Sequence, residues 1–277
     1  MPELRGPALL FCPGDRPERF DKALAAADSV VLDLEDAVGP EHKDLARAHV
    51  VEALGRLDRD RDRVLVRVNA PSSPWHADDL RALAPFREVV VMLPMADGAA
   101  AVEAVPHPVV ALCETARGVL SAQEIAAAGN CVGVMWGSED LVADLGGRPG
   151  RAPGGGYRPA VEEARTRILY AARAAGVTPI DTVLVDIADL DTLAADSTAS
   201  VSAGYAAKAC IHPKQVAVVR AAFRPSDAEV RWADAVLAAA ETESGVFVVD
   251  GRMVDAPVLA HAREVLRQAG VAVAGPQ

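Results

Sequence analysis

The sequence has little of several features that mark membrane, secreted or redox proteins. Aromatic residues make up only 4% of the 277 residues, and no apolar stretch approaches the roughly 18 to 20 residues of a membrane span. The four cysteines form no Cys-x-x-Cys pair, which argues against a zinc ribbon or a dithiol redox centre. The first residues, Met-Pro-Glu-Leu-Arg, lack the basic region and apolar core of a signal peptide. We therefore expect a cytoplasmic protein without a membrane segment, whose cysteines are buried thiols.

Basic charge is also scarce, because 28 lysines and arginines face 39 acidic residues and the net charge is −11. Non-specific nucleic-acid binding relies on basic patches, so we expect no nucleic-acid partner. No Gly-x-Gly-x-x-Gly follows the first apolar run, and no Gly-Lys-Ser/Thr follows the three glycines at 154–156. Dinucleotide and phosphate-loop sites are therefore not indicated. Small anionic substrates remain compatible with this charge, since a local arginine and a metal ion attract them.

Hydrophobic residues, by contrast, make up 51% of the chain, in short strand-like runs separated by alanine-rich segments. Alanine is the best helix former, so the separating segments are expected to be helices. Strands that alternate with helices predict a parallel sheet, and eight repeats fit a (β/α)₈ TIM barrel of the α/β class. A doubly wound open sheet is the alternative. The expected strands are residues 8–12, 29–34, 63–69, 88–93, 109–113, 131–136, 182–187 and 209–212.

Two further helical segments follow the eighth run, near 227–241 and 256–269, with a hairpin-like stretch at 245–251 between them. We therefore predict a TIM-barrel catalytic domain over residues 1–222 and a C-terminal helical extension over residues 223–277. Active sites of such barrels lie at the carboxyl ends of the strands, so the residues that end each run are the candidates for chemistry.

Carboxylates end two neighbouring runs. Glu114 follows the fifth run and Asp140 follows the sixth, 26 residues later, which is about one strand-plus-helix unit. Two adjacent parallel strands would then present both side chains at one edge. Mg²⁺ takes one or two carboxylates together with substrate and water, so the pair is a candidate metal site. The alternative is that both residues stabilise the N-termini of the helices that follow.

The second and third runs add further charged candidates. Glu35 and Asp36 follow the second run, after Asp33, and Arg67 lies within the third. A guanidinium in an apolar strand needs a partner. Arg67 is expected either to bind a substrate carboxylate with two hydrogen bonds or to form a structural salt bridge with Asp33 or Glu35.

Several motifs, in order along nearly the whole chain, resemble the HpcH/HpaI aldolase and citrate lyase beta-subunit family. They include Leu-Asp-Leu-Glu-Asp-Ala-Val (32–38), Val-Arg-Val-Asn (66–69), Glu-Thr-Ala-Arg-Gly (114–118) and Gly-Ser-Glu-Asp-Leu (137–141). Others are Leu-Phe-Cys-Pro-Gly-Asp-Arg-Pro-Glu-Arg-Phe (10–20), Cys-Ile-His-Pro (210–213) and Asp-Gly-Arg-Met-Val-Asp-Ala-Pro (250–257). One such match is weak evidence, whereas this many in the same order is strong evidence.

The resemblance implies a TIM barrel in which Glu114 and Asp140 hold Mg²⁺. It implies that Arg67, Glu114, Gly137 and Ser138 surround the substrate. The reaction implied is cleavage of a 3-hydroxyacyl-CoA, of citryl-, malyl- or citramalyl-CoA type, to a shorter acyl-CoA and a 2-oxo acid such as oxaloacetate.

The resemblance also implies an oligomer, a trimer or hexamer, in which the residue matching Asp255 comes from a neighbouring subunit. The C-terminal extension would then complete that subunit's site. Asp255, or the pair Glu35 and Asp36, is the candidate for acid–base work, and the sequence does not choose between them.

One position departs from the family pattern, which usually reads Leu-Pro-Lys after the fourth strand, because this chain has Leu93-Pro94-Met95. The lost cation keeps two alternatives open: a metal-dependent aldolase for free hydroxy-oxo acids, and a catalytically weak accessory protein. The Gly/Arg-rich loop at 146–157 and Arg16 are candidates for contact with the CoA phosphates. The alternative for the loop is a solvated surface segment.

Overall fold

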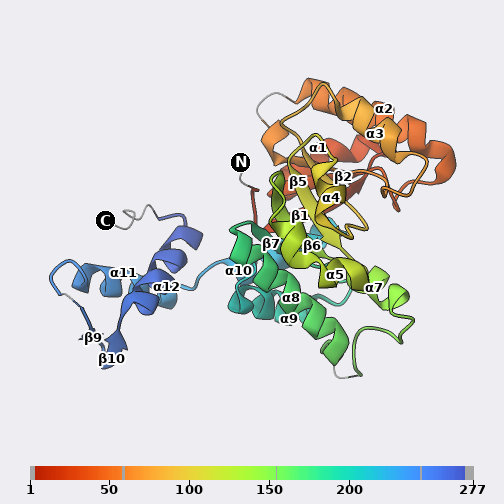
Figure 1. Ribbon diagram of the computed structural model, residues 1–277. Coiled ribbons are helices and arrows are strands. Elements are labelled where there is room, and N and C mark those ends of the chain that lie inside the picture. Colours follow the sequence, from red (N-terminus) through yellow and green to blue (C-terminus); the bar gives the residue numbers. More distant parts are fainter. Residues whose placement is uncertain (1–3, 58–59, 154, 244, 272–277) are drawn as a thin grey trace. The chain divides into compact units, whose positions relative to one another are not determined.

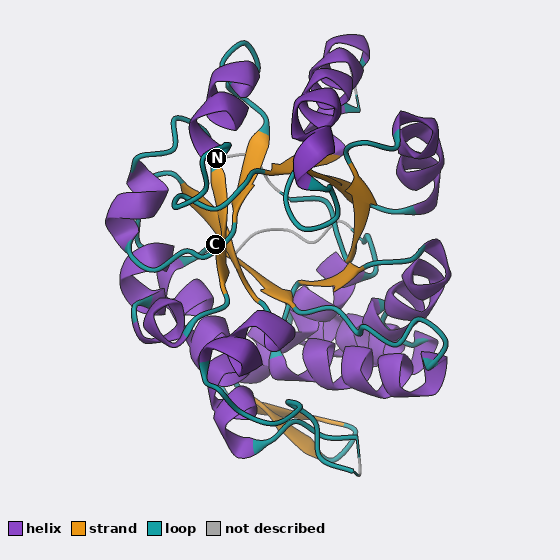
Figure 2. Cartoon of the chain, turned by 90° about the vertical axis from the view of Figure 1, so that its right-hand side faces the viewer, coloured by secondary structure: helices purple, strands orange, loops and turns teal. Residues whose placement is uncertain are grey.

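The computed structural model describes residues 4–57, 60–153, 155–243 and 245–271. The chain divides into two compact units, Met1–Val219 and Arg220–Gln277. The first unit is a closed barrel of eight parallel strands in sequence order, β1 to β8, which confirms the predicted TIM barrel. Figure 2 shows the ring of strands with helices around it. The strands are β1 Ala8–Pro13, β2 Ser29–Asp33, β3 Val64–Arg67, β4 Val90–Leu93, β5 Val109–Cys113, β6 Cys131–Trp136, β7 Thr178–Asp181 and β8 Ala207–Cys210.

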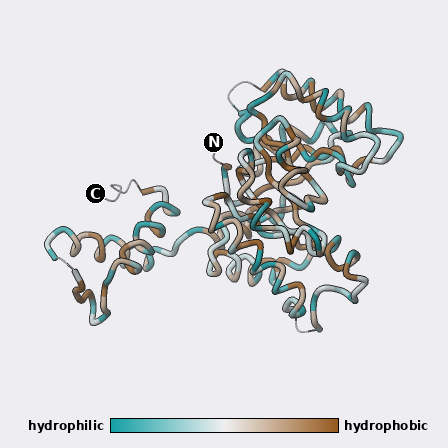
Figure 3. The backbone as a smooth tube through the Cα atoms, in the orientation of Figure 1, coloured by the Kyte–Doolittle hydropathy of each residue, from teal (hydrophilic) through white to brown (hydrophobic). Residues whose placement is uncertain are grey.

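Helices follow each strand along the chain (Figure 1). In Figure 3 these outer helices alternate between hydrophobic and hydrophilic residues, as expected for helices with one face on a core. They are α1 Phe20–Ala26, α2 Lys43–Arg56, α3 His76–Leu83, α4 Ala99–Glu103, α5 Ala116–Leu120, α6 Ala122–Ala126, α7 Ser138–Asp144, α8 Pro159–Ala175, α9 Leu190–Ala203 and α10 Pro213–Phe223, with short 3₁₀ turns at Pro17–Arg19, Pro40–His42 and Arg61–Arg63.

Most strands are buried along their whole length, since one face lines the barrel interior and the other packs on helices. Every residue of β2, β4, β5 and β6 is buried. This explains why these strands read in the sequence as continuous apolar runs instead of alternating ones. Twelve buried side chains fill the interior: Leu9, Val31, Leu65, Val90, Met92, Val110, Leu112, Val132, Met135, Ile180, Ala207 and Ala209.

The seventh strand was predicted at 182–187, and this is wrong. β7 is Thr178–Asp181, which pairs with β6 through Thr178, Pro179 and Ile180. Pro179 argued against a strand there because proline has no N–H for a sheet. The apolar residues of 182–187 form a loop instead, and Val185 is 53% exposed. The loop begins with Thr182 at the barrel mouth, which matters for the site below.

The second unit has its own small core. It contains α11 Asp227–Ala239, the antiparallel hairpin β9 Phe247–Val249 with β10 Arg252–Val254, and α12 Ala256–Gln268. Apolar side chains of both helices and the hairpin pack together: Ala233, Val236, Phe247, Val254, Ala262, Val265 and Leu266. The division between the units falls inside α10. None of the helices among the described residues is long and apolar enough to cross a membrane.

Candidate active site

A cavity of about 380 Å³ opens at the carboxyl ends of the strands, which is where a TIM barrel places its chemistry. Charged and polar candidates from four strand ends line it together with an apolar floor. The lining residues are Phe11, Pro13, Asp33, Asp36, Ala37, Arg67, Leu112, Glu114, Met135, Gly137, Ser138, Glu139, Asp140, Thr182, Val183 and Ile211. The structure therefore brings together most residues that the strand-end argument selected.

Arg67 is held by two carboxylates, one at the end of the preceding strand and one in the loop that follows that strand. Asp33 pairs with Arg67 in the register of β2 and β3. Its carboxylate accepts from Nε at 2.7 Å and from Nη2 at 2.6 Å. Arg67 Nη1 lies 2.8 Å from Glu35 Oε2. Burial alone lowers the pKa of Arg67, but Asp33 outweighs this and raises it. The predicted salt bridge is therefore present. Because Arg67 also lines the cavity, the guanidinium is a fixed positive charge at the mouth.

Glu35 is a buried carboxyl group next to Arg67. Burial raises its pKa to about 7; Arg67 opposes this, and Asp36, Asp33 and Asp140 add to it. Its Oε2 atom is buried and, despite its closeness to Arg67, receives no hydrogen bond of acceptable geometry. Asp36 differs, because its side chain is 71% exposed and lies 4.0 Å from Arg67.

Glu114 is buried at the end of β5, where only 2% of it is exposed. Its Oε1 accepts a hydrogen bond of 2.9 Å from the backbone N–H of Met95. Burial raises the pKa of Glu114 to about 8, the Met95 bond opposes this, and Asp140 and Glu35 raise it further. Crowded carboxylates of this kind are unstable as anions unless a cation lies between them.

Glu114 does not cap the helix that follows it, because the next residue, Thr115, does so. Thr115 is the N-cap of α5, and its hydroxyl accepts from the Gly118 N–H at 2.9 Å. Asp140 does lie in the first turn of α7, as the alternative predicted. Among the described residues, no group of three or more His, Cys, Asp or Glu is arranged to hold a metal. Two carboxylates beside an open cavity nevertheless suit Mg²⁺, which keeps water and substrate as its other ligands.

Met95 contributes through its backbone, a role that the sequence did not reveal. Its φ angle is +50°, in the left-handed region that a side chain with a Cβ rarely adopts. The turn after Pro94 directs the Met95 N–H at Glu114, while the side chain is 37% exposed. The residue that replaces the family's lysine therefore still positions a metal-ligand candidate.

Gly137 leaves room for the Glu114 carboxylate. A Cβ on Gly137 would lie 2.7 Å from Glu114 Oε2 and 2.9 Å from Glu114 Cβ. We expect Gly137→Ala to displace Glu114 and lower turnover by about a hundredfold, the usual cost of a 1 Å misplacement. The φ of Gly137 is −111°, so alanine strains no backbone, but the contact with the buried Glu114 should also cost about 1–3 kcal/mol of stability. A Gly137→Ala variant that is folded by calorimetry and keeps native initial rates would contradict this expectation.

Ser138 lies at the start of α7 and is held by two contacts. Its N–H donates to Thr182 Oγ1 at 3.3 Å, and its hydroxyl donates to Glu139 Oε1 at 3.1 Å. Thr182 was not among the predicted site residues, because it was assigned to the first position of a strand instead of the residue after its carboxyl end. Pro179 inside β7 gave no signal for the true position of that strand.

Asp255 belongs to the second unit. It is the N-cap of α12, where Oδ1 accepts from the Val258 N–H at 3.2 Å. Its proposed catalytic role stays a prediction.

The loop predicted to contact CoA phosphates is partly folded back on the barrel. Arg151 forms an ion pair with Asp196, and its guanidinium lies 4.0 Å from the centre of the Tyr157 ring. Tyr157 in turn packs edge-on against the buried Trp136. The Arg151 guanidinium therefore already has partners within the chain. A solvated surface segment is a poor description of Arg151 and Tyr157. Gly154 lies outside the described residues.

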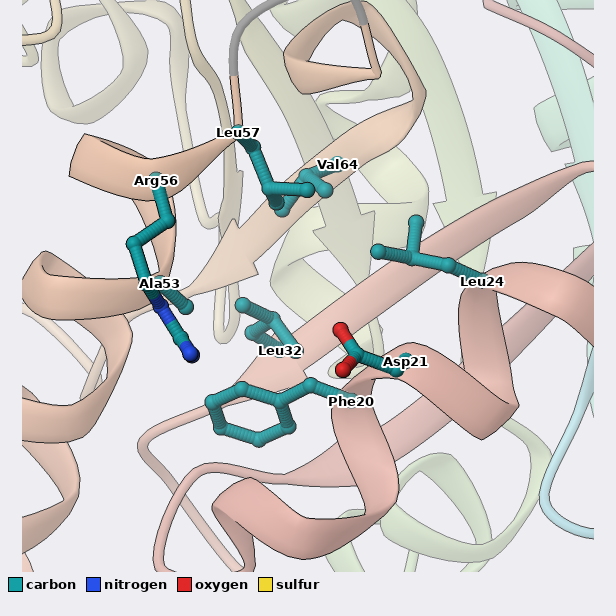
Figure 4. A pocket seen from close by; sticks show the side chains of 8 residues that line it. All are labelled: Phe20, Asp21, Leu24, Leu32, Ala53, Arg56, Leu57 and Val64. Atoms are coloured by element: carbon teal, nitrogen blue, oxygen red, sulfur yellow. The ribbon is translucent and has the colours of Figure 1, made fainter.

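A second cavity lies away from the strand ends, between α1, α2, β2 and β3 (Figure 4). It measures about 160 Å³, and its walls are mainly Leu24, Leu32, Leu57 and Val64. Asp21 and Arg56 border it from the exposed helix surfaces. It lacks converging buried polar groups, so the strand-end cavity is the better candidate for catalysis.

Known proteins resemble the chain over nearly its whole length. A citrate lyase subunit beta-like protein of Mycobacterium tuberculosis is 49% identical over 268 residues, covering 96% of this chain and 97% of the relative. A (3S)-malyl-CoA thioesterase of Cereibacter sphaeroides is 35% identical, covering 95% and 94%. The crystal structure of CitE from M. tuberculosis in complex with magnesium, acetoacetate and coenzyme A superimposes with a TM-score of 0.89 at 48% identity, covering 96% and 98%.

The family model for HpcH/HpaI aldolase/citrate lyase matches residues 8–213, which span the entire barrel and every strand-end candidate discussed above except Asp255. The chain therefore belongs to the HpcH/HpaI aldolase/citrate lyase family.

Proposed function

We propose that the protein is a Mg²⁺-dependent carbon–carbon lyase. Its substrate would be a 3-hydroxyacyl-CoA of citryl-, malyl- or citramalyl-CoA type, and its products a shorter acyl-CoA and a 2-oxo acid such as oxaloacetate. The observation that carries this proposal is the joint placement of Glu114, Asp140 and Arg67 in one cavity, with Glu35 in contact with Arg67. Solved CitE structures from M. tuberculosis with magnesium and either oxaloacetate or pyruvate support it.

Glu114 and Asp140 would hold the metal, which supplies a Lewis acid for the substrate's oxygen atoms. Arg67 faces the same space and stabilises negative charge on the oxygen that becomes the 2-oxo group. Because Asp33 and Glu35 already hold the guanidinium, little reorganisation is needed as charge develops.

Glu35 is the acid–base group that we favour over Asp36. It accepts the proton of the 3-hydroxyl group as the bond between C2 and C3 breaks. The electron pair of that bond passes to the thioester enolate, whose carbon then takes a proton. A pKa of about 7 suits both transfers near neutral pH. Gly137 and Ser138 line the cavity beside the substrate.

A panel of 3-hydroxyacyl-CoA thioesters with Mg²⁺, read by mass spectrometry, tests the proposal. We expect a 2-oxo acid and a shortened acyl-CoA. A free hydroxy acid and CoA would instead show thioester hydrolysis, which the malyl-CoA thioesterase relative makes the second candidate. Cleavage of free hydroxy-oxo acids alone would favour the aldolase alternative. No turnover by the native protein, but turnover by Met95→Lys, would favour the accessory-protein alternative.

We further propose that the protein forms a trimer or hexamer in which Asp255 completes a neighbouring subunit's site. Mixing two inactive variants, Asp140→Ala and Asp255→Asn, tests this. Partial recovery of turnover is expected only if the two residues act from different subunits. The four cysteines are buried, which suits a reducing compartment, so the cytoplasm remains the proposed location.

A further inference from the structure

The short loop that follows β2 brings Asp36 to the cavity wall and Glu35 against Arg67, which lines the cavity. Its N–H groups are satisfied from the barrel side. The Asp33 carboxylate accepts from the Glu35 N–H at 2.9 Å and from the Ala37 N–H at 3.2 Å. The Leu34 carbonyl needs a partner of its own, because buried carbonyls without a hydrogen bond are costly. The Glu35 carbonyl accepts from the Val38 N–H at 3.0 Å and has room for a second partner.

Lys43 supplies both partners from the first turn of α2. It is 6% exposed, and its ammonium group donates to Leu34 O at 2.7 Å and Glu35 O at 2.8 Å. The third hydrogen bond goes to Asn69 Oδ1 at 2.7 Å. All three donors of the ammonium group are therefore used. The Trp75 ring centre lies 5.2 Å from Nζ.

A buried network fixes the position of Asn69, and through it that of Lys43. Asp79 Oδ2 accepts from the Asn69 backbone N–H at 2.9 Å and from Nδ2 at 2.7 Å. Arg47, one turn after Lys43, donates to Asp79 Oδ1 at 3.0 Å. The ends of β2 and β3 are thus tied to α2 and α3 by side-chain hydrogen bonds.

Two cations hold Glu35 from opposite ends. Arg67 lies beside its carboxylate at 2.8 Å, and Lys43 binds its carbonyl oxygen at 2.8 Å. We propose that Lys43 is a positioning residue, which fixes the loop so that the Glu35 carboxyl group meets the substrate. This inference rests on the proposed function, because it concerns how Glu35 is presented for proton transfer. Lys43 itself does not line the cavity.

Lys43→Met keeps the length and the apolar stem and removes the three hydrogen bonds. Arg63→Met is the matched control, since Arg63 also ties one loop through three carbonyls, those of Leu24, Ala27 and Asp28. Arg63 lies at the start of β3, the opposite end from the cavity. Both variants should lose stability. Only Lys43→Met should also lower kcat, by about 10- to 100-fold, with a smaller change in KM.

Hydrogen exchange gives a readout that does not depend on turnover. The amides of Glu35, Ala37 and Val38 are hydrogen-bonded within the loop and should be protected. In Lys43→Met they should exchange faster, while Arg63→Met leaves them protected. Lys43→Arg keeps a cation and should recover part of the kcat and of the protection. Lys43→Gln, which still donates hydrogen bonds, serves if Lys43→Met does not fold.

Equal kcat values for Lys43→Met and Arg63→Met, or unchanged loop exchange in Lys43→Met, would overturn the inference. A native protein that turns over no thioester on the panel would instead remove the proposed function. In that case the exchange comparison alone decides whether Lys43 fixes the loop.

Discussion

Asp140→Ala is expected to abolish measurable Mg²⁺ binding and to lower turnover at least about a thousandfold. Metal polarisation is worth several kcal/mol of transition-state stabilisation, and about 4 kcal/mol corresponds to a factor of roughly 10³. Asp140 faces the cavity in the first turn of α7, so its removal leaves Glu114 as the single remaining candidate ligand of the pair. Titration calorimetry with Mg²⁺, together with initial rates on the best thioester, measures both effects. Unchanged Mg²⁺ affinity would remove Asp140 from the metal site.

The pH dependence of Mg²⁺ affinity provides an independent check on Glu114. Burial raises the pKa of Glu114 in the folded protein to about 8, above the ordinary value for a glutamate. Between these two pH values, the folded protein without metal therefore keeps a proton on Glu114 that the unfolded chain releases. Metal binding requires the carboxylate, so the affinity should rise with pH up to about 8 and then level off. Stability without metal should change in the opposite direction, falling as pH rises from about 4 towards 8. In Asp140→Ala the pKa of Glu114 should decrease, because a neighbouring negative charge is gone.

Arg67→Met is expected to cost about 3 kcal/mol of unfolding free energy, or roughly 10 °C in melting temperature, and to remove activity. The reason is that Asp33, which is fully buried, keeps its negative charge and loses the guanidinium that neutralises it. The backbone N–H groups of Glu35 and Ala37 still donate hydrogen bonds to Asp33. We therefore expect a loss of unfolding free energy at the lower end of the range for a broken buried salt bridge. Thermal unfolding and initial rates measure the two effects.

A second substitution separates the structural role of Arg67 from its chemical role. Adding Asp33→Asn to Arg67→Met removes the stranded charge, so the double variant should regain much of the lost stability. It should stay inactive, because no guanidinium faces the substrate. Recovery of both stability and turnover would show that Arg67 matters for folding alone.

The sequence was enough to predict the barrel, because short contiguous patterns of residues specify most of its strands and helices. Helix α8, Pro159–Ala175, illustrates this, because local signals mark both of its ends. Pro159 suits the first turn, and Gly176 ends the helix with a φ of +70°. The prediction of the seventh strand failed because the short Thr178–Asp181 segment contains Pro179 and forms a strand through pairing with β6 and β8. Proline and aspartate do not favour a strand by themselves.

The sequence by itself determined which chemical groups stand at the strand ends, because strand order and residue spacing bring Glu114, Asp140 and Arg67 to one face of any such barrel. Only the tertiary structure decided how these groups are held. The Met95 N–H, the space at Gly137 and the Lys43 ammonium act on residues 8 to 26 positions away, through contacts that no local pattern encodes. Pairing across the barrel depends on three-dimensional packing, and so do the burial and the neighbouring charges that raise the pKa values of Glu35 and Glu114. The identity of the candidate catalytic groups is therefore local information, whereas their pKa values are set by the burial and the neighbours that folding provides.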